Sequence, residues 1–509
     1  MSNFHHLQFV RTIFLFPAMI TIMIKSATSF CHPSKGPDQF PIKEVTIDEL
    51  QAGFKQNKLT SRELVEFYVS QIKKLNPTLR AVIEVNPDAL EQAQRADKER
   101  RDKARNSDGG ADHLPMLHGI PILLKDSIAT KDMMNTTAGS FALLGKIVAK
   151  DAGVVQRLRQ AGAIIPGKAS LSEWAHFRSS LAPSGWCART GQGKATSGLK
   201  EKEHDHCSIL QNPHNLSADP CGSSSGSAIA AAANIVAVTL GTETDGSILC
   251  PSTYNSVVGI KPTVGFDADD YEATKKVADY IPRGGYAQFL KPHGLQGKSL
   301  GIVRNPFFNY LIKGSLMDVT FKRHLLTLRE SGAVLLNNLE IPNIDAIISS
   351  DAETTALHAE FKLAINSYLK QLVKSPVRSL ADLIQFNKRF AKKEKLKEYG
   401  QDIFIAAEAT NGIGPKEKKA LSEMAKRSRD GFEKVMKENK LDAIVTPNSY
   451  FSGVLAIGGF PGINVPAGYD EQGVPFGICF GGLTVTEPTL IEIAYAFEQA
   501  TKIRNPPPS

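Results

Sequence analysis

The 509-residue sequence has few cysteines, no concentrated block of positive charge and, beyond its N-terminal segment, no long apolar run. A net charge of +8 is a weak excess at this length, and nucleic-acid binding usually requires a concentrated basic face. The six cysteines show no metal-type Cys-x-x-Cys spacing. These absences argue against a nucleic-acid-binding protein, a cysteine-ligated metal protein and a protein with several membrane spans.

The N-terminal segment has the pattern of a secretory signal. Arg11 precedes a largely apolar run at 12–24, and small residues follow at 26–29. The run is shorter than the ~20 apolar residues of a spanning helix. We therefore expect residues 1–29 to be a cleaved signal peptide, with a signal anchor as the alternative. Asn-x-Ser/Thr sequons at Asn135 and Asn215 fit a secreted glycoprotein, in which one or two disulfides could form.

The rest of the chain predicts one α/β domain over 42–503, because no internal repeat or long low-complexity linker divides it. Capping boxes at 46–49 and 60–63 each begin a helix. The alternation of strands and helices predicts a mixed, largely parallel sheet with helices on both faces. Strands are expected at 81–85, 120–124, 163–165, 236–240, 441–446 and 475–479, and helices at 87–105, 153–161, 170–176, 228–233 and 487–500. A Lys-rich helical stretch at 355–440 is expected to be a solvated cover.

Three segments carry the candidate chemistry. Lys125 ends the apolar run 120–124, a Gly/Ser loop occupies 221–227, and Gly-Thr-Glu-Thr-Asp-Gly-Ser occupies 241–247. A lysine buried beside hydroxyls can lose its charge and act as a base, and serine needs such a neighbour to become a nucleophile. The loop-like residues before the Gly/Ser segment, and the lack of a lysine within it, disfavour dinucleotide and Walker phosphate sites. The pattern therefore indicates an acyl-transfer enzyme that cuts amides.

Together these segments resemble the signature of the amidase signature family of serine hydrolases. The resemblance extends from about residue 45 to residue 500 and includes the motifs at 136–140, 259–265 and 459–468. The motif GTETDGSILCP most resembles the peptide-amidase branch and plant amidases of that type. The resemblance implies the amidase-signature fold and hydrolysis of a small amide or a peptide amide, without a metal or an organic cofactor.

The resemblance also implies a Ser–cis-Ser–Lys triad, with Lys125 as the base, Ser223 as the bridging serine and Ser247 as the nucleophile. The reaction would pass through an acyl-enzyme and release ammonia or an amine. Ser224 and Gly222 would support the triad. The oxyanion hole would be formed by the backbone N–H groups of Thr244, Asp245, Gly246 and Ser247.

Two segments depart from the family pattern. Residues 195–211 are a polar insertion, expected to be a surface loop, although His204, His206 and Cys207 could bind a metal. After Gly265 a few tens of residues of expected core are missing. Loss of a strand and a helix exposes apolar surface at ~25 cal/mol per Å², which can exceed a domain's stability of ~5–15 kcal/mol. A catalytically impaired form is therefore a second hypothesis.

That second hypothesis is an inactive fold that serves as a binding or decoy protein. A third is a protein resembling the amidase-type component of glutamyl-tRNA amidotransferase, which the signal-like start disfavours. Three further residues are interpreted as structural: His118 as a packed turn residue, because no Gly-x-Ser-x-Gly elbow is present, and Cys221 and Cys250 as buried thiols.

Overall fold

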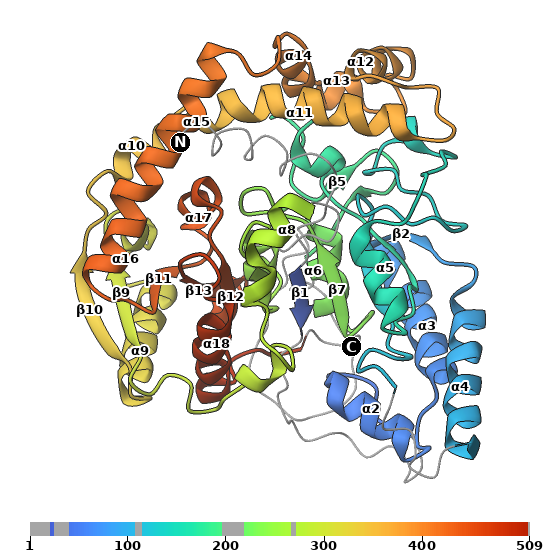
Figure 1. Ribbon diagram of the computed structural model, residues 1–509, viewed down its shortest axis with the longest axis horizontal. Helices are drawn as coiled ribbons and strands as arrows, with labels where there is room; N and C mark the ends of the chain where they lie inside the picture. Colours follow the sequence, from blue (N-terminus) through green and yellow to red (C-terminus); the bar gives the residue numbers. More distant parts are fainter. Residues whose placement is uncertain (1–20, 25–39, 107–113, 196–217, 266–270, 507–509) are drawn as a thin grey trace.

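The computed structural model describes residues 21–24, 40–106, 114–195, 218–265 and 271–506 (Figure 1). Within these ranges the chain forms two mixed β-sheets, a small hairpin and many helices. Both sheets are buried between helices, so the predicted α/β arrangement is confirmed. Parallel pairing is confined to part of each sheet, and antiparallel pairs complete both of them.

The first sheet has the strand order β1-β7-β3-β4-β2. Its strands are β1 (Thr21–Ile24), β2 (Val82–Val85), β3 (Ile122–Lys125), β4 (Gly167–Ala169) and β7 (Val238–Gly241). The strands predicted at 81–85, 120–124 and 236–240 are present. The strand predicted at 163–165 is displaced: Ile164 makes an isolated bridge with Pro121, and the regular strand is β4. Every residue of β3 is buried, as its continuous apolar sequence requires.

The second sheet has the order β10-β9-β11-β13-β12-β8. Its strands are β8 (Gly259–Lys261), β9 (Ser299–Val303), β10 (Val334–Leu339), β11 (Ala443–Pro447), β12 (Gly462–Tyr469) and β13 (Pro475–Gly481). Both C-terminal strands predicted from the sequence are present, as β11 and β13. The hairpin consists of β5 (Trp186–Cys187) and β6 (Gly191–Gln192).

Helices cover both sheets. On the first sheet lie α2 (Ile47–Lys55), α3 (Ser61–Leu79), α4 (Ala89–Asn106), α5 (Gly153–Gln160) and α6 (Ser225–Ala232). Around the second lie α7 (Leu249–Tyr254), α8 (Tyr271–Val277), α9 (Leu316–Glu330), α10 (Ile344–Ile348), α17 (Ser452–Gly458) and α18 (Glu487–Thr501). The helix predicted at 170–176 is reduced to a short 3-10 turn, Glu173–His176.

Both predicted capping boxes are present. The Thr46 and Thr60 hydroxyls accept backbone N–H bonds from Glu49 and Glu63, and each glutamate accepts the N–H of its threonine in return. These reciprocal bonds satisfy N–H groups that a helix start leaves unpaired, so local sequence fixes where α2 and α3 begin.

A helical cap spans the top of the molecule in Figure 1. It comprises α11 (Ala352–Gln371), α12 (Leu380–Arg389), α13 (Leu396–Tyr399), α14 (Asp402–Glu408) and the start of α15 (Pro415–Ser428). From there α15 runs down the left side of the view to α16 (Lys434–Glu438), which lies beside the second sheet. Its inner side chains, such as Phe361 and Phe404, pack on Ala138 and Trp174 of the body, so this stretch is more than the solvated cover that its lysines suggested. Buried Arg178 anchors the cap by donating to the Glu394 carbonyl at 2.6 Å.

Strand β1 lies at the edge of the first sheet nearest the second. It pairs antiparallel with β7, with Thr21 opposite Gly241 and Ile24 opposite Val238, and it also lies against β8. Figure 1 shows β1 between β7 and β12. The second sheet begins at β8, which ends four residues before Gly265. A backbone segment from the N-terminal region thus lies where the two sheets approach each other.

Candidate active site

Lys125 is the last residue of β3, and its side chain is completely buried, with 0% exposure. Its position follows from the strand: the apolar residues before it hold the chain in the core, and the amine is carried into the protein with them. A lysine is rarely found so deep unless its amine is hydrogen-bonded or neutral. The groups that surround the Lys125 amine therefore decide whether it is charged or neutral.

The Lys125 Nζ lies among oxygens from two loops. Its distances are 2.7 Å to Ser223 Oγ, 2.9 Å to Ser224 Oγ, 2.9 Å to Thr242 Oγ1 and 3.2 Å to the Thr242 carbonyl. Ser223 and Ser224 precede α6, and Thr242 follows β7. No carboxylate pairs with Lys125 within the described residues. Three hydroxyls and one carbonyl are therefore its immediate partners.

The hydrogen-bond directions leave the amine able to accept a proton. Ser224 Oγ donates its hydrogen to the Thr242 carbonyl at 3.0 Å and accepts the Thr242 N–H at 3.1 Å, so toward Lys125 it can act only as an acceptor. The Thr242 carbonyl is also only an acceptor. A neutral amine has two hydrogens, which these two acceptors use. Its lone pair then remains for the hydroxyl of Ser223 or Thr242.

Burial lowers the pKa of Lys125 to about 7, because the protonated form loses hydration. Glu243 acts in the opposite direction, since its negative charge favours the protonated form. A substantial fraction of Lys125 is therefore neutral near neutral pH, which is the state a general base requires.

Ser247 is brought beside the Lys125 cluster through the backbone. The Ser224 N–H donates to the Ser247 carbonyl at 3.0 Å, which joins the Gly/Ser loop to the loop after β7. No hydrogen bond joins the hydroxyls of Ser223 and Ser247 in the described part of the chain. The peptide bond between Gly222 and Ser223 is cis. The structure thus places all three predicted triad residues in one region, with a direct side-chain bond only between Lys125 and Ser223.

The loop that carries Ser247 presents unused N–H donors. The backbone N–H groups of residues 244–247 have no acceptor among the described protein groups. Gly246 has a φ of +69°, a conformation that favours glycine and allows the tight turn. Thr244 and Asp245 are exposed and Ser247 is partly buried, whereas Lys125 is fully buried. The loop 244–247 therefore reaches from the surface toward the interior and carries backbone donors that no described group uses.

The interpretation of Cys221 and Cys250 as buried thiols is wrong. The two residues form a disulfide and are only partly buried. Cys221 lies two residues before Ser223, and Cys250 lies three residues after Ser247, so the bond ties the two serine segments together covalently. Sequence spacing could not reveal this pair, because six cysteines allow many connectivities. Cys187 and Cys479 are free and buried.

Several residues of the site were missed by the sequence argument. Thr242 contacts the Lys125 amine, and Glu243 holds the loop that follows it. Asp126 accepts the Gly139 N–H at 3.0 Å and fixes the turn at 136–140 beside Lys125. Thr242 and Glu243 lie within the motif at 241–247, but only the three-dimensional contacts separate them from its other members.

Other sequence-predicted residues lie elsewhere. His118 is buried between Glu99, at 2.9 Å from Nε2, and Arg100, at 3.2 Å from Nδ1, which fits its interpretation as a packed turn residue. The side-chain amide of Asn135, the first residue of one sequon, donates a hydrogen bond to Glu84 at 2.9 Å. The second sequon, at Asn215, lies outside the described residues. So does the insertion at 195–211 with its His-Asp-His-Cys run, apart from Ala195, which is buried.

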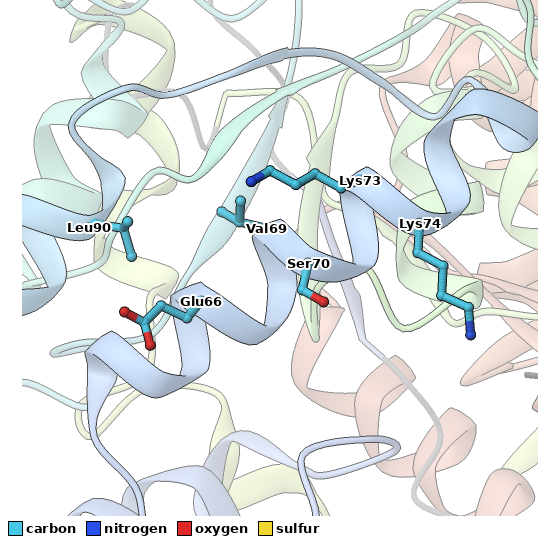
Figure 2. Close-up of a pocket in the computed structure, with 6 residues that line it drawn as sticks. All are labelled: Glu66, Val69, Ser70, Lys73, Lys74 and Leu90. Carbon is cyan, nitrogen blue, oxygen red and sulfur yellow. The ribbon is translucent and has the colours of Figure 1, made fainter.

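Apart from this site, a shallow hollow runs along α3 (Figure 2). It is lined by Glu66, Val69, Ser70, Lys73, Lys74 and Leu90. None of the residues around Lys125 belongs to it. Among the described residues, no group of His, Cys, Asp or Glu side chains is arranged to hold a metal ion, and no helix has the length and apolar character to cross a bilayer.

Comparison with known proteins identifies the class. The Amidase family model matches residues 63–269. A probable amidase of Arabidopsis thaliana is 55% identical over 506 residues, which covers 92% of each chain. The crystal structure of native peptide amidase from Stenotrophomonas maltophilia superposes with a TM-score of 0.80 at 37% identity, covering 92% of this chain and 99% of that one.

The chain therefore belongs to the amidase signature family and is an amidase, a hydrolase of amide bonds. A glutamyl-tRNA(Gln) amidotransferase component of Microcystis aeruginosa is more distant, at 27% identity over 522 residues, covering 91% of this chain and 99% of that protein. The resemblance read from the motifs is confirmed, and so is the expected fold class.

Proposed function

We propose that this amidase uses a Ser247–Ser223–Lys125 triad and an acyl-enzyme intermediate. The observation that carries the proposal is the fully buried Lys125 amine, 2.7 Å from Ser223 Oγ, with its lone pair left for a hydroxyl. An amine in bulk water would be protonated at neutral pH and could not act as a base.

In the proposed reaction, Ser247 Oγ attacks the substrate carbonyl while its proton passes to Ser223 Oγ, and the Ser223 proton passes to Lys125 Nζ. The carbonyl oxygen becomes an oxyanion, held by the unused N–H donors of the loop 244–247. The C–N bond then breaks as the proton returns through Ser223 to the leaving amine. Water hydrolyses the resulting ester by the same proton route, which frees the acid and restores Ser247.

We propose a small amide or a peptide C-terminal amide as the substrate. Support comes from two solved structures of peptide amidase at 37% identity, one of which is a complex with the competitive inhibitor chymostatin. The exposure of Thr244 and Asp245 supports a role for this loop in contacting a substrate. The lower identity to the amidotransferase components favours hydrolysis over ammonia transfer to a partner.

Incubation with a C-terminally amidated dipeptide is expected to yield ammonia and the free acid in equal amounts. Added hydroxylamine should divert part of the product to a hydroxamate, because it competes with water for an acyl-enzyme. A panel of amides graded by acyl size would define the preferred substrate. Folded protein that releases no ammonia from any of these amides would support the binding-protein hypothesis instead.

We further propose that the chain enters an oxidising compartment through its N-terminal segment. The Cys221–Cys250 disulfide supports this, because such bonds persist mainly in oxidising compartments. N-terminal sequencing of the protein from its native source is expected to begin after the small residues 26–29, which would remove β1. A mature chain that still contains residues 21–24 would contradict cleavage and indicate that β1 remains in the sheet.

A further inference from the structure

Two buried ionisable residues, Glu243 and Lys261, lie outside the cluster around Lys125. Glu243 follows β7 and is 4% exposed, and Lys261 ends β8 and is 1% exposed. Neither side chain bonds to the hydroxyls around Lys125. Burial of a charged group is unfavourable unless other groups compensate for it, so each needs a reason to be there.

The Glu243 carboxylate bridges the two ends of the loop 244–247. Its Oε2 accepts the N–H groups of Ile248 at 2.6 Å and Leu249 at 2.9 Å, the two residues that directly follow Ser247. One oxygen therefore joins the beginning of the loop to its end. The other oxygen, Oε1, is buried and has no hydrogen-bond partner in the described part of the protein. The backbone donors need only an acceptor oxygen, which a neutral amide would also supply.

The charge of Glu243 has partners on both sides. The Lys261 amine donates to the carbonyls of Phe460 at 2.6 Å and Pro262 at 3.3 Å. Burial raises the pKa of Glu243, and the positive charge of Lys261 is the main influence that opposes this rise. Glu243 in turn raises the pKa of Lys125. The charges form an alternating series: Lys125 on β3, Glu243 after β7 and Lys261 on β8.

Other titratable groups act on this series more weakly. Glu487, Asp245 and Cys479 raise the pKa of Lys261 in addition to Glu243, while burial lowers it. Asp245 raises the pKa of Glu243, but its influence is smaller than those of Lys261 and the two backbone N–H groups. For Lys125 the charged group that opposes burial is Glu243. Burial is the larger influence on the pKa of Lys125, and the Glu243 charge opposes it.

We propose that Glu243 is a positioning residue for the triad, which fixes the loop 244–247 through one carboxylate oxygen and acts on the Lys125 amine through its negative charge, while Lys261 keeps that charge in place. The inference rests on the proposed function of Lys125. A base must take up a proton during attack and return it to the leaving amine, and a nearby negative charge stabilises its protonated form. The two actions are separable, because only the second needs a charge.

The variant Glu243→Gln separates them, since its amide oxygen can still accept both backbone N–H groups. The acid limb of the pH profile for kcat/KM should move to lower pH by about one unit, because the Lys125 amine loses a negative neighbour and stays neutral at lower pH. Glu243→Ala removes both actions and should also lower kcat. Lys261→Met should move the acid limb in the same direction as Glu243→Gln, and the double variant should move it no further.

Glu360→Gln is the matched control, because Glu360 is another buried carboxyl, on α11, that does not act on Lys125. Its acid limb should coincide with that of the parent. A folded Glu243→Gln enzyme whose acid limb also coincides with the parent would overturn the inference. Should that variant not fold, Lys261→Arg, which keeps the charge, compared with Lys261→Met gives the same test.

The variant Lys125→Ala, measured in parallel, separates failure of the inference from failure of the proposed function. Retained activity in Lys125→Ala would remove the lysine from the mechanism and the inference with it. An inactive Lys125→Ala enzyme together with an unmoved acid limb in Glu243→Gln would overturn only the role of Glu243.

Discussion

Replacement of Ser247 by alanine is expected to abolish labelling by a fluorophosphonate probe and to reduce amide hydrolysis by about 10⁶-fold, the loss seen when a serine hydrolase loses its nucleophile. The physical reason is that, in the proposed mechanism, the Ser247 hydroxyl is the nucleophile whose proton passes through Ser223 to Lys125. Probe labelling followed by intact-mass measurement checks both the stoichiometry and the modified site.

Ser225 supplies the matched control for Ser247. It lies in the same Gly/Ser loop as Ser223, and its hydroxyl is buried without a hydrogen-bond partner among the described groups. Ser225→Ala should therefore be labelled and active at close to the parent rate, with an unchanged circular dichroism spectrum. Labelling that persists in Ser247→Ala would show that another residue is the nucleophile. A folded parent that takes up no probe would favour the decoy hypothesis.

Replacement of Lys125 by alanine should lower amide hydrolysis by several orders of magnitude, since Ser247 would lose the acceptor for its proton. In the parent, activity is expected to be present above pH 7 and to fall by about tenfold per unit below it. The sign follows from the pKa of about 7: the amine is neutral above this value and becomes protonated as the pH falls through it. Lys125→Arg should be as inactive as Lys125→Ala, because a guanidinium stays charged at these pH values.

Lys168 distinguishes the chemistry of Lys125 from burial alone. It is also fully buried, with a pKa lowered to about 8 by burial, but its amine bonds to the Ile128 carbonyl and Thr136 Oγ1, not to the serines. Lys168→Met should lower thermal stability and leave the acid limb near pH 7. If the acid limb disappeared in Lys168→Met and persisted in the residual activity of Lys125→Ala, the titrating group would be Lys168 and not Lys125.

The sequence predicted the local elements well where the signal was itself local. The capping boxes at Thr46 and Thr60 and the buried strand β3 are set by neighbouring residues, and all three were found as expected. The strand at 163–165 was misplaced, since a short apolar stretch does not show which of its residues will find a partner in the sheet. In the Lys-rich cap the charges dominate the sequence pattern, but apolar residues such as Phe361 bind the cap to the body.

Gly265 marks another point where sequence alone was insufficient. The lack of expected core after this residue suggested an impaired enzyme, yet the structure keeps Lys125, Ser223 and Thr242 together. The described strands form two sheets, with β1 against β7 and β8. The residues around Lys125 are held mainly by β3, β7 and the start of α6, which belong to the first part.

By itself, the sequence determined the family, the positions of the lysine and the two serines, and most of the elements that carry them, because motifs and periodicity are written in consecutive residues. Folding was needed to show that the Lys125 amine is buried among hydroxyls, that Cys221 bonds to Cys250, and that the Glu243 carboxylate accepts the N–H groups of Ile248 and Leu249. Burial, covalent pairing and the interaction of charges depend on distances between segments that are far apart in the chain, and those distances exist only once the two sheets have packed.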